Sequence, residues 1–122
     1  MKHLIFVVFF LFTYNVNANW ITFYQSQIFD AKLLLSSVRQ EGQKTQALIE
    51  LKFKERISSD EVASHVLIME HTCGEMNHSI IEEKFYRGTP NKSKEINISD
   101  NHQKFKEYIS ELLPSLIKQT CI

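Results

Sequence analysis

The sequence predicts an α+β fold: an antiparallel β-sheet of five or six strands, followed by one C-terminal amphipathic helix packed on one face, with one disulfide. Three observations predict this fold class. Residues 66–69 form an unbroken apolar run typical of a central strand, and residues 47–54 alternate with a period of two. Residues 105–117 instead repeat at helical spacing. Strands that come first and a helix that comes last favour a helix laid across an antiparallel sheet.

The first residues predict export. Met1-Lys2-His3 is a short basic start, residues 4–12 are almost wholly apolar, and Val16-Asn17-Ala18 offers small residues for cleavage. This layout predicts a signal peptide over residues 1–18, with an uncleaved membrane anchor as the alternative, although the apolar segment is short for a bilayer span. No cysteine lies near the cleavage site, so we expect an exported protein, periplasmic or extracellular, without a lipid anchor.

The remaining residues, 19–122, predict a single domain, because roughly 100 residues suffice for one hydrophobic core. The chain has 14 Lys and Arg residues against 14 Asp and Glu residues. A near balance of charge gives no long-range field toward nucleic acid or an anionic membrane. We therefore expect a protein partner, no nucleic acid and no stable membrane insertion after signal cleavage. The sequence also allows the protein to form a homodimer.

The two cysteines predict one covalent crosslink. An even pair in an exported chain indicates a disulfide, here Cys73–Cys121, whereas two cysteines are too few for a structural zinc site unless histidines join them. Closing this loop should stabilise the fold by about 4 kcal/mol in the chain-entropy model. The bond would hold the end of the chain against the end of the central strand.

The strands are expected in the following order. Residues 20–23 and 28–35 form the first two strands, and Arg39–Gln43 forms a turn at its glycine. A strand with one wet face covers residues 47–54, although Leu48 breaks its alternation and leaves a helix as the alternative. The central strand, 65–73, is expected to be buried on both faces over 66–69; further strands cover 76–86 and the edge, 95–98.

The C-terminal helix is predicted from its ends and its apolar stripe. Asp100 with Gln103 forms a capping-box pattern, with Ser99 as the alternative cap. Pro114 predicts a kink or a break, because proline removes a hydrogen bond and clashes with the preceding turn. The stripe is expected to pack on the sheet rather than on a membrane, because its polar side is not enriched in basic residues. It consists of Phe105, Ile109, Leu112, Leu113, Leu116 and Ile117.

The order of these parts resembles the surface-adhesin protein E family, small exported domains of Gram-negative bacteria. The resemblance rests on a Trp at the mature start, the turn Ser36-Ser37-Val38-Arg39-Gln40-Glu41-Gly42, the strand that ends in Cys73, the strand that ends in Phe85-Tyr86, and the helix that ends in Cys121. It covers nearly all of the mature chain.

The resemblance implies an antiparallel sheet packed against a helix, with the two cysteines bonded. It also implies binding of host matrix proteins such as vitronectin and laminin, and a link to haem in some members. The region held responsible in the family corresponds here to residues 56–73. On this basis the candidate protein-binding residues are Arg56, Ser58, Asp60 and Glu61.

Catalysis is not expected. Both thiols are explained as bonded, and the chain has no Gly-x-Ser-x-Gly motif and no Gly-rich phosphate loop. The carboxylate pairs Asp60-Glu61 and Glu82-Glu83 are neighbours in sequence, and neighbours on a strand point to opposite faces. The pairs therefore do not converge on one substrate.

The histidines offer a weaker hypothesis. His71, Met76 and His78 would lie near one another across neighbouring strands and form a soft site for haem or a transition metal. The alternative is histidines on the sheet surface, solvated or hydrogen-bonded, and no cofactor is expected. The sequence thus predicts an exported, non-enzymatic binding protein that contacts host matrix or envelope proteins. The alternatives are a periplasmic inhibitor or immunity protein, and a haem or metal carrier.

Overall fold

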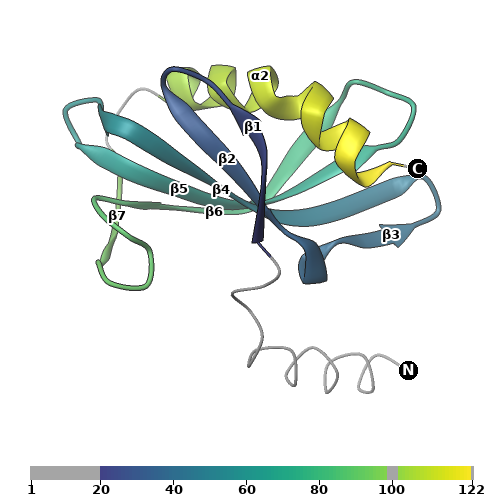
Figure 1. Ribbon diagram of the computed structural model, residues 1–122, viewed down its shortest axis with the longest axis horizontal. Coiled ribbons are helices and arrows are strands. Elements are labelled where there is room, and N and C mark those ends of the chain that lie inside the picture. The colour runs from purple at the N-terminus through teal and green to yellow at the C-terminus, as the bar shows by residue number, and fades with distance from the viewer. Residues whose placement is uncertain (1–19, 99–101, 122) are drawn as a thin grey trace.

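The computed structural model describes residues 20–98 and 102–121, which form one β-sheet and one helix (Figure 1). The predicted signal peptide and the predicted helix caps Ser99 and Asp100 lie outside the described residues. The elements are β1 (Trp20–Gln25), β2 (Phe29–Leu34), the 3-10 turn η2 (Leu35–Ser37), β3 (Arg39–Glu41), β4 (Lys44–Ile57), β5 (Val62–Thr72), β6 (His78–Tyr86), β7 (Glu95–Ile96) and α2 (His102–Thr120).

All neighbouring strands are antiparallel, in the order β1-β2-β4-β5-β6-β7, and β3 pairs with the first residues of β4. The long strands β4 and β5 form the centre, and α2 crosses one face (Figure 1). The predicted fold class is confirmed. The strand count exceeds the expectation because the segment predicted as a turn contains β3.

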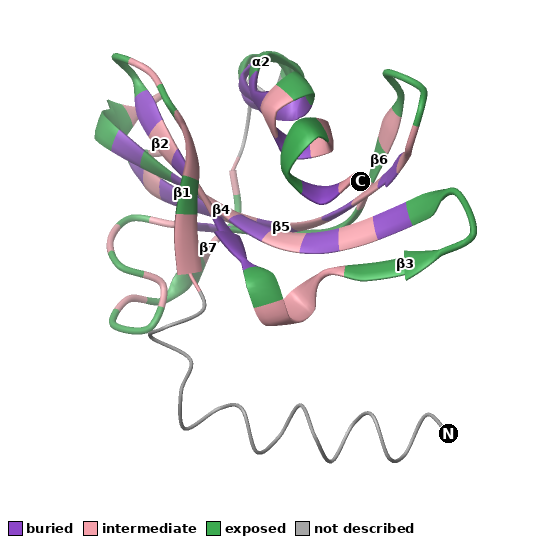
Figure 2. Cartoon of the chain, turned by 45° about the vertical axis from the view of Figure 1, so that its right-hand side comes forward, coloured by how far each residue is buried: buried purple, intermediate pink, exposed green. Residues whose placement is uncertain are grey.

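The core lies between α2 and one face of the sheet, as the purple bands in Figure 2 show. Alternation selects that face: in β4, Ile49 and Leu51 are fully buried while Glu50 between them is not. The helix contributes its stripe from the other side. The buried set includes Phe29, Ala31, Leu33, Ala47, Ile49, Leu51, Phe53, Leu67, Met69, Phe85, Phe105, Tyr108, Ile109, Leu112, Leu113 and Leu116.

Aromatic rings fill the core near the start of α2. The Phe105 ring packs edge-on against Phe53 and Phe85, at centroid distances of 5.8 and 5.0 Å, and Tyr108 lies 5.4 Å from Phe29. Tilted and edge-on aromatic pairs are favourable arrangements that add to the burial of their area. This cluster anchors the first half of the helix on β2, β4 and β6.

The disulfide anchors the other end of α2. Cys73 follows β5 and Cys121 follows α2, and the two are bonded, with their Cα atoms 5.7 Å apart. The predicted bond is confirmed. Helix α2 is therefore held on the sheet by aromatic packing near one end and by a covalent bond at the other.

Two local expectations about strand boundaries are wrong. The segment 39–43 was expected to be a turn only, but Arg39–Glu41 pairs with β4, which extends past the end of β2 and leaves its first residues open for a partner. Gly42 sits at the turn itself, with a φ of +64° that favours glycine. The strand expected from Met76 begins at His78 instead, and Met76 is 64% exposed.

Pro114 neither breaks nor ends the helix, which runs unbroken from His102 to Thr120. The carbonyl that loses its hydrogen bond to proline belongs to Ser110. Both residues are exposed, so water can hydrate that carbonyl and the loss is small. No helix among the described residues has the length and apolar character that a membrane crossing requires.

The centre of β5 also departs from the expectation of burial on both faces. Leu67 and Met69 are buried in the core, whereas Val66 and Ile68 are only half-buried. The physical reason is that residues 20–98 and 102–121 contain a single α-helix, which covers a single face. The other face, here called the helix-free face, therefore carries aliphatic side chains in contact with solvent.

Replacing Cys73 and Cys121 by alanine should lower the free energy of unfolding by about 4 kcal/mol, because the bond closes a loop with a sequence separation of 48. Urea denaturation of the oxidised protein and the double variant, followed by circular dichroism, measures the difference. A loss below about 1 kcal/mol would contradict the assigned role of the bond.

Candidate functional site

The predicted binding residues lie at the end of β4, which contains Arg56, and in the connection from β4 to β5. The guanidinium of exposed Arg56 donates to the carboxylate of Glu61 over 3.1 Å, which forms an ion pair across the turn. The backbone N–H of Asp60 donates to the hydroxyl of Ser58 over 3.2 Å. The structure thus brings all four predicted residues into one tight turn at the tip of the central hairpin.

This turn has an unusual backbone. Ser58 and Glu61 have φ angles of +67° and +57°, in the left-handed region that residues other than glycine rarely adopt. Such a conformation costs about 1 kcal/mol or more and persists where the surroundings hold it. One holding contact comes from Arg87, whose side chain donates to the carbonyl of Asp60 over 2.9 Å. These contacts therefore hold the backbone of the β4–β5 tip in a defined conformation, which we call a held loop.

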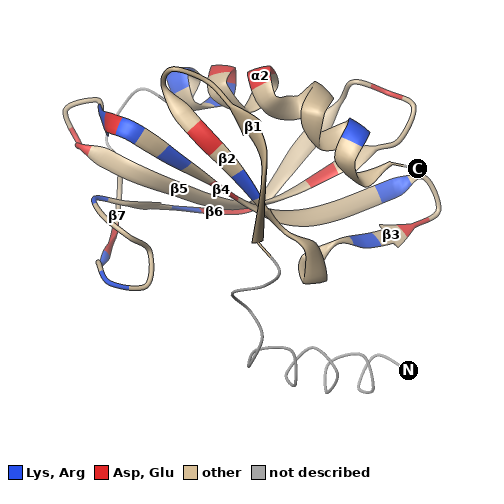
Figure 3. Ribbon diagram, in the orientation of Figure 1, with Lys and Arg blue, Asp and Glu red and all other residues tan. Residues whose placement is uncertain are grey.

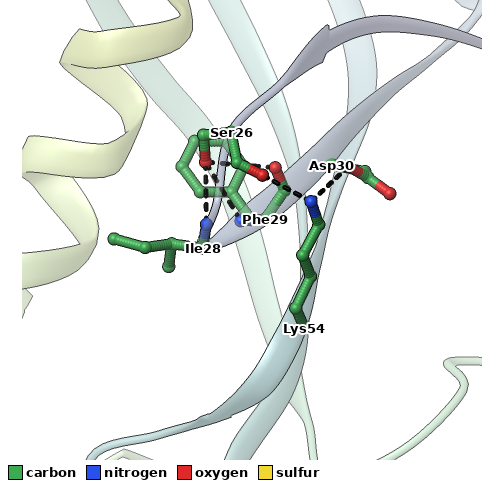
Figure 4. A network of polar contacts seen from close by, with 5 residues as sticks. All are labelled: Ser26, Ile28, Phe29, Asp30 and Lys54. Carbon is green, nitrogen blue, oxygen red and sulfur yellow. Dashed lines mark hydrogen bonds and ion pairs between the residues drawn. The ribbon is translucent and has the colours of Figure 1, made fainter.

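The neighbouring β1–β2 turn is tied to β4 at the same end of the sheet (Figure 4). The Ser26 hydroxyl accepts from the backbone N–H groups of Ile28 and Phe29, each over 3.1 Å. The Lys54 ammonium donates to the Ser26 carbonyl over 2.6 Å and pairs with Asp30 at 3.8 Å. These contacts fasten the strand that leads to Arg56.

The structure places the three residues of the predicted soft site in different surroundings. His71 and His78 face each other across β5 and β6, but Met76 lies before β6 and is 64% exposed. His71 is only 1% exposed and contacts Thr120 over 2.9 Å. Burial, aided by the charge of His78, lowers the pKa of His71. The alternative of a surface histidine is therefore wrong for His71, which lies inside the core.

His65 is also buried, and it faces the core. Its ring stacks on Phe85 at a centroid distance of 4.1 Å, and its Nε2 lies 2.8 Å from the Glu83 carboxylate. The surface alternative is wrong for this residue too. Glu83 lies beside Glu82 in the sequence, but Glu82 pairs with Ile68 and points to the helix-free face, as adjacent strand residues should.

The helix-free face has an aliphatic centre that the sequence analysis did not identify as a site. Leu48 of β4 pairs directly with Ile68 of β5, and Val66 lies two residues from Ile68 on the same face. All three are half-buried, and α2 lies on the other face of the sheet. The sequence did carry a signal: Leu48 interrupts the alternation of β4 and places an apolar side chain on the wet face.

Two shallow hollows flank this centre. One lies between Ser37, Arg39, Leu48 and Ile68, and the other between Leu48, Ile68, Lys84 and Tyr86. The aliphatic centre thus has a charged and aromatic rim. A centre that is poor in charged residues, surrounded by a polar rim, is the usual composition of a protein-binding surface.

A larger hollow, of about 390 Å³, lies on the same face. Glu50 and Lys32 pair across β4 and β2 at its floor, and Lys52 follows Glu50 on the same face. Trp20 and the loop that contains Pro90 complete its walls. Figure 3 shows charges of both signs on β2 and β4, so the hollow offers a partner an indole ring beside mixed charges.

Glu50, the acidic residue that lines this hollow, has a perturbed pKa. Burial raises the pKa of its carboxyl above the ordinary value of 4.5, and the charges of Lys32 and Lys52 oppose that shift. Perturbed carboxyl groups in a concave surface are common at functional sites, although structural networks produce them too. Burial thus leaves the Glu50 carboxyl partly desolvated.

No protein-family model, curated protein or solved structure matches this chain.

Replacing Glu50 by glutamine should increase the free energy of unfolding relative to the native chain, and the increase should become larger as the pH rises. The folded-state pKa of Glu50 is raised, so its neutral form fits the fold and stability is lost as the pH rises through that pKa. Glutamine does not ionise, so the variant does not lose this stability. We therefore expect the difference in unfolding free energy, variant minus native, to grow between about pH 3 and pH 7.

Urea denaturation at several pH values measures this difference, and exposed Glu82→Gln on the same face is the matched control. A pH-independent difference for Glu50→Gln, or an equal growth for the control, would show that burial does not govern Glu50.

Proposed function

We propose that this chain is an exported, non-enzymatic binding protein of the surface-adhesin protein E type, which contacts a host matrix or envelope protein. In this proposal the helix-free face is the main contact surface and the β4–β5 tip is a second. The observation that carries the proposal is the aliphatic centre of Leu48, Val66 and Ile68, which no described element covers and which polar and aromatic side chains surround.

The architecture supports the resemblance. The family implies a sheet packed against a helix with the two cysteines bonded, and this chain has those parts in that order. The bond and the helix occupy one face only. A domain built in this way keeps the whole opposite face for recognition, because its own core needs only the first.

The chemistry of the helix-free face supports a protein partner. Binding energy at protein interfaces concentrates in a few aromatic and arginine side chains near hollows. Trp20 and Tyr86 line hollows on either side of the aliphatic centre, and Arg39 lines a third. A partner that covers these hollows would exclude water from the half-buried aliphatic groups.

The β4–β5 tip supports contact through a held loop. Its conformation is maintained by the Arg56–Glu61 ion pair and by Arg87, so binding would order few additional bonds. The same observation favours the second candidate function, an inhibitor of an envelope enzyme, because a preorganised loop on a rigid hairpin suits the blocking of an active site.

Surface plasmon resonance on immobilised vitronectin and laminin tests the proposal. The oxidised exported domain should bind at least one of them. Ile68→Glu should weaken binding at least about tenfold, because it places a charge in the centre of the contact. Arg56→Glu should also weaken binding. The matched control is Lys104→Glu, on an exposed part of α2, which should leave binding unchanged.

A second control separates the charge of Arg56 from the shape of its turn. The double variant Arg56→Glu with Glu61→Arg restores the ion pair in reversed order, so a persistent loss assigns the effect to contact with the partner. Binding that survives both Ile68→Glu and Arg56→Glu contradicts the two assigned surfaces. Binding to neither matrix protein, with capture of an envelope enzyme and its inhibition, would replace the adhesin by the inhibitor.

A further inference from the structure

A second cluster lies on the opposite side of the sheet, where the end of α2 meets the end of β5. One ring nitrogen of His71 and the sulfur atoms of Cys73 and Cys121 all lie within 4.8 Å of one another. His71 is 1% exposed, and both cysteines are half-buried. Two residues with soft sulfur atoms and one imidazole therefore share one side of the core.

The hydrogen bonds of Thr120 determine the protonation of the imidazole. The Thr120 hydroxyl donates its only hydrogen to the carbonyl of Leu116 over 2.8 Å. It can then only accept from His71, whose Nε2 lies 2.9 Å away. The proton of the neutral ring thus sits on Nε2, and Nδ1 carries the lone pair.

No described residue donates a hydrogen bond to this lone pair. His71 Nδ1 is buried without a hydrogen-bond partner among the described residues. Leaving a buried acceptor unpaired costs free energy, so such a group in a folded protein calls for an explanation. A histidine that donates from one nitrogen to an oxygen and keeps the other free has the arrangement of a metal ligand.

We propose that the reduced chain binds Zn²⁺ through His71 and the thiolates of Cys73 and Cys121. A dithiol reductant supplies two electrons and two protons to the Cys73–Cys121 bond and is itself oxidised to a disulfide. Zn²⁺ then displaces the two thiol protons to the solvent. The three protein ligands leave one of the four tetrahedral positions for water.

The dimensions of the cluster agree with this site. Zn–S distances of about 2.3 Å and Zn–N distances of about 2.0 Å place tetrahedral ligand atoms about 3.5 to 3.8 Å apart. A ring nitrogen of His71 and the two sulfur atoms already lie within 4.8 Å of one another, and the sulfur atoms separate once their bond is cut. The ion would hold the end of α2 on β5 in place of the disulfide.

This assignment gives the chain two states of the same clamp. In an oxidising space the disulfide joins α2 to β5, and in a reducing environment with zinc the ion does so. The two states exclude each other, because the sulfur atoms that bind the metal are those that form the bond. The site is independent of the helix-free face and of the function proposed for it.

Zinc titration of the full exported chain tests the proposal. A phosphine reduces the disulfide, with water supplying the oxygen of the phosphine oxide and the two thiol protons, and is then removed. A chromophoric chelator that competes for Zn²⁺ reports the affinity. The reduced protein should bind one ion per chain, and the oxidised protein should bind none. Co²⁺ in place of Zn²⁺ should show thiolate-to-cobalt charge-transfer bands.

Two variants separate the assigned ligand from its neighbour. His71→Gln should weaken zinc binding at least about tenfold. His78→Gln, which alters the residue facing His71 on β6, should change it less than about twofold. Circular dichroism of both variants in the oxidised state verifies that they fold.

The remaining outcomes also support or overturn the zinc site. If the reduced chain unfolds, Zn²⁺ should restore its near-ultraviolet circular dichroism, and His71→Gln should reduce that recovery. Equal zinc affinity of His71→Gln and the native chain would overturn the proposal. Equal zinc binding by the oxidised protein, or the absence of zinc binding by the reduced protein, would overturn it too.

Discussion

The bond between Cys73 and Cys121 holds the end of α2 on the apolar face of the sheet. It joins the end of α2 to the end of β5, while the aromatic cluster of Phe53, Phe85 and Phe105 holds the helix near its start. Held at both ends, the helix covers one face of the sheet. The opposite face is left uncovered by that placement, because the described residues contain no second α-helix to cover it.

An uncovered face with aliphatic groups at its centre has a physical cost that a partner can remove. Val66 and Ile68 keep part of their area in water while Leu67 and Met69, on the same strand, are buried. The hollows beside them and the held β4–β5 tip give this face shape as well as composition. The buried side of the same strand carries His71 and the disulfide, so one central strand organises both the proposed binding surface and the proposed metal site.

The sequence predicted the parts that depend on periodicity and on cysteine count. The alternation around Ile49 and the stripe around Leu112 identified the sheet and the helix, and an even number of cysteines predicted the bond. It did not predict the burial of His65 and His71, because facing the core depends on which side the helix covers. It could not decide between a kink and a break at Pro114, because the exposure of the residues around that proline, which lets the helix continue, appears only in the fold.

Hydrogen exchange of the oxidised and reduced chain, measured by mass spectrometry without added metal, tests the central role of the bond most directly. The account predicts faster exchange in the last turns of α2 and at the end of β5 on reduction, while the paired centres of β4 and β5 keep their protection. Unchanged exchange in the last turns of α2 after reduction would contradict it, since the helix would then be held on the sheet without the bond.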